Sequence, residues 1–252
     1  MKLAILQARY SSSRLPGKVM KPLLGVPMLA RQIERIRRAR CIDRLMVATS
    51  TDVSDNVIVS LCNSLEVDCY RGSLDDVLDR YYQAALTYRP EHVIRLTGDC
   101  PLIDPLVIDA VVEQHVMNAN DYTSNTQPPT FPDGLDVEVM RFATLHRAWH
   151  ETTLPSQREH VTYYIYTTMP EVRIGQLQCA VDWSALRWTV DEPADFKFVE
   201  QVYASLYSKK SDFDMELILE LLRQRPDLVA INQGIERNEG LFQSLGKDKN
   251  AI

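Results

Sequence analysis

Residues 6–18 (LQARYSSSRLPGK) place polar and cationic side chains directly after a short aliphatic run, residues 3–6 (LAIL). That run predicts a buried strand, so the polar residues begin where the chain leaves a sheet, which is the edge at which open α/β sheets bind ligands. Backbone N–H groups, three serines and the cations Arg9, Arg14 and Lys18 suit a polyphosphate. The loop taken alone is equally typical of a solvated basic turn.

Two carboxylates stand at the ends of other expected strands. Asp99 lies in residues 95–105 (RLTGDCPLIDP), after a glycine that permits close approach, and Asp191 lies in residues 186–193 (LRWTVDEP). An aspartate in such a place can meet Mg²⁺ or a ribose hydroxyl, although a turn or N-cap role is the equal alternative for Asp99. If the strands are neighbours, the two carboxylates and the basic loop would together hold Mg²⁺ against a triphosphate.

Several common catalytic motifs are missing from the sequence. No GxGxxG follows the first expected strand, and Gly17-Lys18 is followed by Val19 rather than by the serine or threonine of a Walker loop. No GxSxG elbow occurs. His146 and His150 are four apart on one helical face, but the glutamate of HExxH and a third ligand are lacking, so surface or partly packed histidines are the better interpretation.

Bulk composition restricts the class of protein. With 252 residues and 45% hydrophobic content, the chain can bury a sizeable core. A net charge of -6 argues against nonspecific binding to nucleic acid or to an anionic membrane. We find no signal peptide and no run of about 18 apolar residues, so we expect a soluble cytoplasmic protein. Five cysteines without a CxxC pair indicate neither a disulfide framework nor a zinc site.

The first 117 residues alternate between strand and helix patterns, which predicts a parallel sheet with helices on both faces. One helix starts on a proline, and another is expected to have Ser73 as its N-cap, with Asp76 completing a capping box. The expected strands are residues 3–8, 44–50, 67–70 and 92–97. The expected helices are residues 27–40, 51–65, 73–88 and 105–116.

The alternation loosens beyond residue 118. Residues 125–134 (NTQPPTFPDG) predict an exposed loop, and residues 118–180 as a whole predict a small lobe built against the main sheet within one domain, residues 1–231. The polar residues 232–252 are expected to be partly ordered at best. Further expected strands are residues 135–140, 172–177 and 186–190. Further expected helices are residues 142–153, 157–167, 192–207 and 213–224.

Together, residues 7–29, residues 95–105 and residues 187–196 (RWTVDEPADF) closely resemble the cytidylyltransferases that activate acidic sugars as CMP-sugars. Within that group the chain is most similar to the SpsF family of spore coat polysaccharide biosynthesis proteins. The synthetases for CMP-Kdo and CMP-N-acetylneuraminate are more distant. The resemblance runs from residue 1 to about residue 246 and includes the stretches GSLDDVLDRYYQAA, SNTQPPTFPDGLDVEV and SQREHVT.

The resemblance implies an α/β, Rossmann-like nucleotide-diphospho-sugar transferase fold, with a mostly parallel sheet and a small inserted lobe that often makes a homodimer. It also implies the reaction: a sugar hydroxyl attacks the α-phosphate of CTP, and pyrophosphate leaves in the presence of Mg²⁺. Carried over by position, the site residues fall into four groups: Gln7, Ala8 and Arg9 at the nucleotide, Ser13, Arg14 and Lys18 at the phosphates, Asp99 and Asp191 at the metal, and Arg71 and Arg80 as further nucleotide-side residues.

Such a transfer needs charge stabilisation more than covalent help, so Arg14, Lys18 and Asp99 are the expected catalytic residues. The general base stays open: the metal could lower the pKa of the attacking hydroxyl, or Asp99 could accept its proton. Arg71 and Arg80 could instead form helix or turn ion pairs.

Acceptor recognition is expected from the second half of the chain. An acidic sugar needs a cation for its carboxylate, and Arg158 offers bidentate geometry, although a solvated helix residue is the stronger alternative. Asp133, Asp136 and His160 are the other expected acceptor residues. The surface-polysaccharide function has two competitors. One is a nucleotidyltransferase of the same fold with another nucleotide or sugar, and the other is a catalytically silent nucleotide-binding protein.

Overall fold

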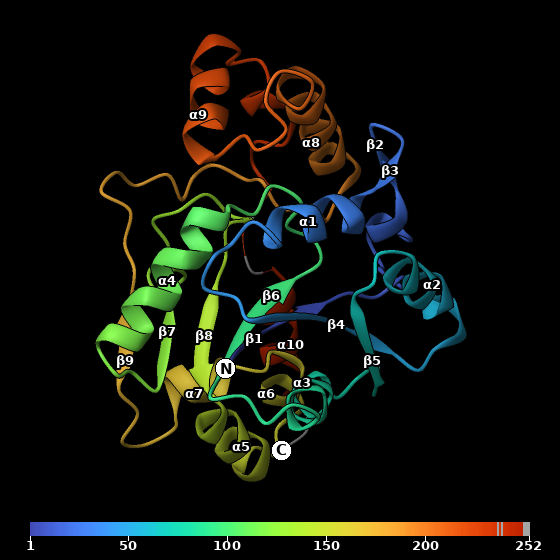
Figure 1. The fold of residues 1–252 in the computed structure, drawn as a ribbon. Helices are drawn as coiled ribbons and strands as arrows, with labels where there is room; N and C mark the ends of the chain where they lie inside the picture. Colours follow the sequence, from blue (N-terminus) through green and yellow to red (C-terminus); the bar gives the residue numbers. More distant parts are fainter. Residues whose placement is uncertain (236, 238, 249–252) are drawn as a thin grey trace.

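The computed structural model describes residues 1–235, 237 and 239–248, and within them seven strands form one sheet in the order β5-β4-β1-β6-β8-β7-β9 (Figure 1). Only β8 runs antiparallel to its neighbours, so the sheet is mostly parallel and the predicted α/β class is confirmed. The strands are β1 Lys2–Gln7, β4 Arg44–Ser50, β5 Asp68–Gly72, β6 His92–Thr97, β7 Tyr122–Ser124, β8 Glu138–Arg141 and β9 Ile174–Gln176. A separate hairpin pairs β2 Pro22–Leu23 with β3 Val26–Pro27.

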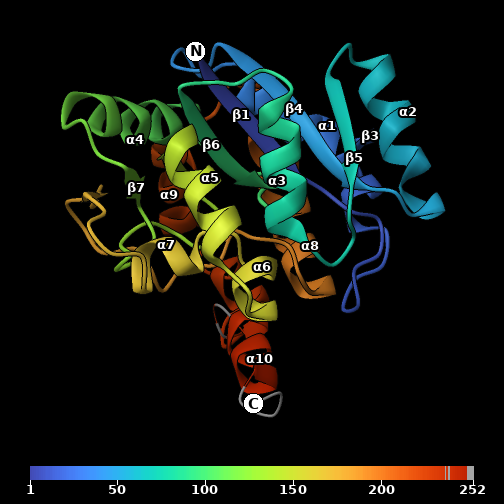
Figure 2. The ribbon, with the colours of Figure 1, turned by 90° about the horizontal axis from the view of Figure 1, so that it is seen from below.

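Helices cover both faces of the sheet, as the alternation predicts. Figure 2 shows α3 and α5 in front of the strands and α1 behind them. The helices are α1 Met28–Ile36, α2 Asn56–Ser64, α3 Val77–Leu86, α4 Pro105–Met117, α5 Phe142–Glu151, α6 Pro155–Glu159, α7 Tyr163–Thr167, α8 Pro193–Leu206, α9 Met215–Gln224 and α10 Glu239–Asp248. Short 3-10 turns are η1 Lys18–Met20, η2 Val53–Asp55 and η3 Val229–Ile231.

Two apolar cores hold these layers together. The larger lies between the sheet and α1, α2 and α4 and continues to α8 and α9, and the smaller lies beneath α3 and α5. Leu3, Ala4, Ile5 and Leu6 of β1 are fully buried, because a parallel strand covered on both faces has no solvent side. None of the helices in the described part of the chain is long and apolar enough to cross a membrane.

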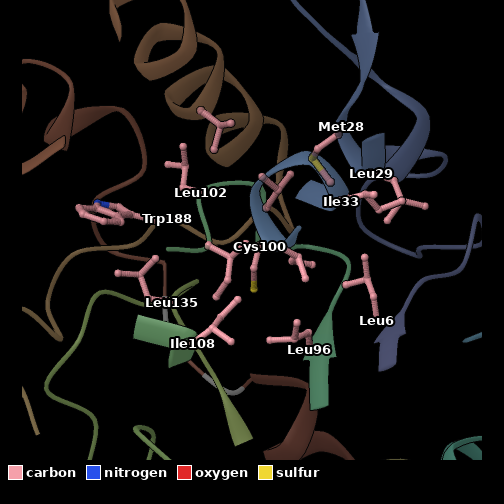
Figure 3. Packing of buried hydrophobic residues seen from close by; sticks show 14 of the residues in the cluster. Leu6, Met28, Leu29, Ile33, Leu96, Cys100, Leu102, Ile108, Leu135 and Trp188 are labelled. Carbon is pink, nitrogen blue, oxygen red and sulfur yellow. The ribbon is translucent and has the colours of Figure 1, made fainter. Parts of the chain in front are cut away.

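The loop after β6 is anchored in the larger core. Figure 3 shows Cys100 and Leu102 among Leu96 of β6, Ile33 of α1 and Ile108 of α4. The Tyr203 hydroxyl of α8 donates a 2.8 Å hydrogen bond to the Pro101 carbonyl. The backbone that carries Asp99 is therefore fixed by packing on its far side, although the loop itself lies at the sheet edge.

The ends of β1 and β6 approach each other closely. Gln7 pairs in register with Thr97, and the Gly98 N–H donates a 2.7 Å hydrogen bond to the Gln7 carbonyl. A Cβ on Gly98 would stand 2.9 Å from that same oxygen, so only glycine fits without a shift. The loops that follow β1 and β6 therefore start side by side, at the point where the strand order reverses.

The loop at residues 125–134 is not exposed as predicted, since only Gln127 and Pro128 in it are exposed. Four further predicted elements come out differently. Residues 186–190 are not a strand in the sheet, since Arg187 makes only an isolated bridge to Asp133. Ser73 is not the N-cap of α3: it accepts a hydrogen bond from the Asp76 N–H, and Asp76 caps the helix. The helix expected at 157–167 is broken into α6 and α7 at Val161, whose φ is +54°.

The fourth difference concerns the polar tail. Residues 239–248 form helix α10, whereas residues 236, 238 and 249–252 of the predicted tail lie outside the described residues. The expected small lobe, residues 118–180, contributes β7, β8 and β9 to the main sheet and three helices beside it. In Figure 2, α10 lies on the side of the molecule opposite to the N-terminus.

Candidate active site

Three adjoining cavities lie at the carboxyl ends of β1 and β6. The loop cavity, about 280 Å³, is lined by the basic loop, including Gln7, Ala8, Arg9, Ser13, Arg14 and Lys18. The central cavity, about 210 Å³, is lined by five carboxylates: Asp99, Asp133, Asp136, Asp191 and Glu239. The inner cavity, about 130 Å³, lies toward Glu138 and Arg237. Thr97 and His160 line all three, so the cavities form one continuous site.

The basic loop is held in shape by backbone contacts and by one buried carboxylate. The Tyr10 carbonyl accepts hydrogen bonds from the N–H groups of Ser12 and Gly17, and Gly17 has a φ of +69°, a conformation that favours glycine. Asp55 accepts a 2.6 Å bond from the Tyr10 N–H and also binds Thr49, so it ties the loop to β4. The sequence did not indicate Asp55, because its contact with the basic loop joins residues 45 positions apart.

Lys18 joins the two predicted metal carboxylates. Its Nζ lies 2.9 Å from Asp191 Oδ1 and 3.6 Å from Asp99 Oδ2, and it donates a 2.7 Å hydrogen bond to the Val190 carbonyl. Burial lowers the pKa of Lys18, but the charges of Asp99 and Asp191 more than offset this, and the pKa is raised. Burial likewise opposes the charge of Asp99, yet Lys18 and the Thr97 hydroxyl hold its pKa below the ordinary value.

Arg187 organises the carboxylates of the central cavity. Its guanidinium donates hydrogen bonds of about 3.0 Å to Asp133, Asp191 and Asp195. Asp195 is fully buried and also accepts from the N–H groups of Asp191 and Glu192, which completes the capping box of α8. Arg187 stands in the segment predicted as a strand, and nothing in the sequence pattern marked it as the centre of this network.

The carboxylates deeper in the site are costly to ionise. Burial, together with the charge of Asp136, raises the pKa of Asp133 to about 7, although Arg237 and Arg187 oppose the shift. Burial also raises the pKa of Asp136 despite its ion pair with Arg237. Asp133 and Asp136 are therefore harder to ionise than Asp99, whose pKa is lowered.

His160 projects from the break between α6 and α7, next to the strained Val161. Burial lowers the pKa of His160, which keeps its imidazole neutral near pH 7, and its Nε2 atom makes no hydrogen bond. The buried Gln7 Oε1 and Arg95 Nε atoms also lack partners. Unsatisfied buried polar atoms gathered at one place are typical of a site that binds a ligand.

Three predicted site residues do not line the cavities. Arg158 pairs with Asp76 at 2.7 Å and donates to the Trp149 carbonyl, so its guanidinium is used to tie α6 to α3 and α5. Arg71 donates to the Ser50 and Asp52 carbonyls at the end of β4, and Arg80 donates to the carbonyls of Ser73 and Leu74. Arg71 and Arg80 thus bond backbone carbonyls, and Arg158 is held by an ion pair rather than by solvent alone.

Asp99 and Asp191 could share a divalent cation only if Lys18 Nζ, which now lies between them, turned toward a bound phosphate. Asp99 and Asp191 both lie within 4 Å of that single atom, and Mg²⁺ is usually held by one or two carboxylates together with water and substrate phosphates. Within the described residues no group of three or more His, Cys, Asp or Glu side chains could hold a metal by itself. Any ion here would depend on the substrate for its remaining ligands.

The fold defines this chain as an α/β protein of the nucleotide-sugar transferase type, with a polar crevice at the carboxyl ends of β1 and β6. The family model for cytidylyltransferases matches residues 3–230. The chain belongs to the cytidylyltransferase family.

Relatives of the chain support the same family. It is 31% identical over 232 residues to the spore coat polysaccharide biosynthesis protein SpsF of Bacillus subtilis, covering 89% of this chain and 95% of SpsF. It is 35% identical over 237 residues to an uncharacterized protein of Methanocaldococcus jannaschii, covering 93% and 96%. It is 28% identical over 238 residues to the 3-deoxy-manno-octulosonate cytidylyltransferase of Syntrophotalea carbinolica, covering 92% and 86%.

Solved structures share the fold. A cytidylyltransferase from Leptospira borgpetersenii superposes with a TM-score of 0.88 at 27% identity, covering 94% of this chain and 99% of its own. A CMP:2-keto-3-deoxy-manno-octonic acid synthetase complexed with CTP superposes with a TM-score of 0.63 at 17% identity, covering 81% and 98%. The predicted nucleotide-sugar transferase fold is confirmed, and so is the predicted similarity to SpsF and to CMP-Kdo synthetases.

Proposed function

We propose that the protein transfers CMP from CTP to an acidic sugar and releases pyrophosphate, as a step in surface polysaccharide biosynthesis. The observation that carries the proposal is the meeting of the basic loop with Asp99 and Asp191, which Lys18 joins within 4 Å. A triphosphate needs this combination of fixed cations and a metal-binding carboxylate pair. The names of the relatives, SpsF and the 3-deoxy-manno-octulosonate cytidylyltransferases, support the choice of nucleotide and acceptor.

The bond changes assign a role to each part of the site. The acceptor hydroxyl oxygen bonds to the α-phosphorus of CTP, and the bond from that phosphorus to the bridging oxygen breaks, so that pyrophosphate leaves. Arg14 and Lys18 neutralise charge on the phosphates, and Ser13 and backbone N–H groups of the loop hold them. Mg²⁺, bound by Asp99 and Asp191, would supply further charge neutralisation at the reacting phosphate.

The hydroxyl proton passes to a carboxylate of the central cavity. Asp133 is well suited to this role, because it lines the central cavity beside Asp99 and burial raises its pKa, which makes it a stronger base than an ordinary carboxylate. Asp99, the other candidate, is held ionised by Lys18 and is better suited to a cation. Gln7, Ala8 and Arg9 line the loop cavity on the side where the nucleoside would lie.

Pyrophosphate release tests the proposal. Wild type and Asp99→Asn are compared with CTP, UTP, ATP and GTP, with and without Mg²⁺, and with a panel of acidic and neutral sugars. We expect CTP-selective, Mg²⁺-dependent release with one acid, and a loss of at least 100-fold in Asp99→Asn, because the substitution removes one carboxylate charge from the metal site.

Other results would favour the competing functions. Release with a different nucleotide would identify a nucleotidyltransferase of the same fold but other specificity. Tight CTP binding without release for any sugar would identify a silent nucleotide-binding protein. An undiminished rate in Asp99→Asn would remove Asp99 from the metal site.

A further inference from the structure

An acidic acceptor needs a cation beyond those that serve the triphosphate. Arg158 cannot supply it, since its guanidinium faces Asp76 and lies outside the cavities. Arg187 is engaged by three aspartates. Among the described residues that line the central and inner cavities, Arg95 and Arg237 are then the remaining arginines away from the basic loop.

Arg95 belongs to the wall of the inner cavity. It forms a buried ion pair with Glu138, and Glu138 also accepts hydrogen bonds from the hydroxyls of Tyr122 and Thr162. Breaking such a buried pair leaves an uncompensated charge inside the protein. Arg95 is therefore a poor candidate for leaving Glu138 to bind a ligand carboxylate. Its Nε atom makes no hydrogen bond, and its guanidinium contributes positive charge to the cavity wall.

Arg237 is more lightly held. Its Nη2 donates a 2.6 Å hydrogen bond to Asp136 Oδ1, its Nη1 lies 3.5 Å from the Phe131 carbonyl, and its Nε lies 3.6 Å from Asp133 Oδ1. A guanidinium has five N–H donors, and these contacts include one short hydrogen bond. Arg237 therefore keeps donors for a carboxylate in the cavity that it lines.

The position of Arg237 suits an acceptor that reaches the metal site. The inner cavity shares Thr97, Asp136 and His160 with the central cavity, where Asp99 lies. A carboxylate on Arg237 would leave the rest of the acceptor pointing toward Asp99. Asp136, released from Arg237, could then accept a hydrogen bond from an acceptor hydroxyl.

We propose that Arg237 selects acidic acceptors by binding their carboxylate in the inner cavity. The inference rests on the proposed cytidylyl transfer, and it assigns to Arg237 the role that the sequence suggested for Arg158. Asp133 and Asp136, on either side of Arg237, repel an anion that has no hydrogen-bond donors. An acceptor must therefore donate hydroxyl hydrogen bonds to these aspartates while its carboxylate binds Arg237. A polyhydroxylated sugar acid meets both requirements.

The test compares an acid with its neutral ester. The variants are Arg237→Met, Arg237→Lys and the control Arg225→Met, whose side chain pairs with Asp227 at the surface. The probes are 3-deoxy-manno-octulosonate, N-acetylneuraminate and their methyl esters, each with CTP and Mg²⁺. Pyrophosphate release gives kcat/KM, calorimetry gives the affinity of each probe, and thermal unfolding checks that the variants fold.

We expect Arg237→Met to lower kcat/KM for the acid by at least 30-fold, mainly through the acceptor KM, because a charge-assisted bidentate contact is lost. The value for the ester should change less than threefold, and so should the KM for CTP. Arg237→Lys should recover part of the loss. In calorimetry the preference of wild type for the acid over the ester should disappear in Arg237→Met.

Equal losses for acid and ester, or an equal rise in the KM for CTP, would show that Arg237 is structural and would overturn the inference. CTP-dependent release with neutral sugars alone would also overturn it while leaving cytidylyl transfer intact. Wild type that neither prefers the acids in calorimetry nor releases pyrophosphate with them would count against the proposed acceptor and against Arg237 together.

Discussion

Arg187 shows how one side chain can hold a whole site in place. Arg187 is buried, and its guanidinium bonds Asp133 of the central cavity, Asp191 of the proposed metal-binding pair and Asp195 at the start of α8. These acids come from two loops and a helix that would otherwise repel each other. The positions of the carboxylates in the proposed active site thus depend on a residue that contacts no phosphate in the proposed mechanism.

Arg187→Met should therefore reduce stability more than an ordinary surface change. It leaves three carboxylates without their common partner, and breaking a buried ion network costs about 3–5 kcal/mol. For a chain of this size that corresponds to a fall in Tm of roughly 10 °C. Thermal unfolding of wild type, Arg187→Met and Arg225→Met measures it, and a shift no larger than that of the surface control would contradict the role given to Arg187.

At the scale of elements, the first turn of α10 lines the site, and contacts with Arg14 and α6 hold the helix there. Its first residue, Glu239, pairs with Arg14 at 3.1 Å, and Ser244 and Asp248 bond residues of α6. Gly240 lines both the loop cavity and the central cavity. A triphosphate bound by Arg14 would have to compete with the carboxylate of Glu239.

Glu239→Gln should consequently strengthen CTP binding. The pair is partly exposed, so its contribution is about 0–1 kcal/mol, and the Kd for CTP should fall by up to about fivefold. Calorimetry with wild type, Glu239→Gln and the surface control Glu220→Gln on α9 measures the change. Weaker CTP binding in Glu239→Gln alone would mean that this carboxylate helps to hold the nucleotide.

At the scale of the whole molecule, the edge of the sheet opposite the active site contains a buried histidine pair. His92, the first residue of β6, has its Nδ1 atom 3.1 Å from His115 Nε2 of α4, and His115 Nδ1 lies 3.0 Å from the Thr123 hydroxyl. Burial lowers the pKa of His115 to about 4, and the neighbouring His92 adds to the shift. The folded protein therefore keeps this pair neutral.

Stability should fall in acid for this reason. The pKa of histidine in the unfolded chain is about 6.5, so between pH 6.5 and about 4 the unfolded state binds more protons than the folded state. The stabilisation is complete above pH 6.5 and is lost as the pH falls through that window. The total loss in the free energy of unfolding is at most about 3 kcal/mol.

Chemical unfolding at pH 7 and pH 5 measures this loss. His115→Gln should show a smaller difference between the two pH values than wild type, because the substituted side chain does not titrate. His150→Gln, on the exposed surface of α5, should behave as wild type. An unchanged pH dependence in His115→Gln would contradict the assignment.

The sequence by itself determined the layers of the fold and the residues of the basic loop. Strands β1 and β4 contain continuous apolar runs (LAIL and LMVA), and β6 contains Val93, Ile94 and Leu96. Such segments separated by amphipathic helices have few ways to fold other than as a parallel sheet. Because parallel strands end at one edge, the positions of Lys18 and Asp99 near each other followed from the order of the elements. The strand β7, only three residues long, gave no comparable pattern.

The tertiary structure alone decided which cations face the site. Arg158 and Arg237 are both arginines in polar stretches, and local sequence cannot tell which of them meets Asp76 and which meets Asp136. That choice depends on long-range packing: α6 docks on α3, while the chain returns after η3 to bring Arg237 and α10 over the cavities. Hydrophobic periodicity predicts helices and strands because it is a local property of the sequence. The ion pairs of Arg158 and Arg237 join residues 82 and 101 positions apart, which only folding brings together.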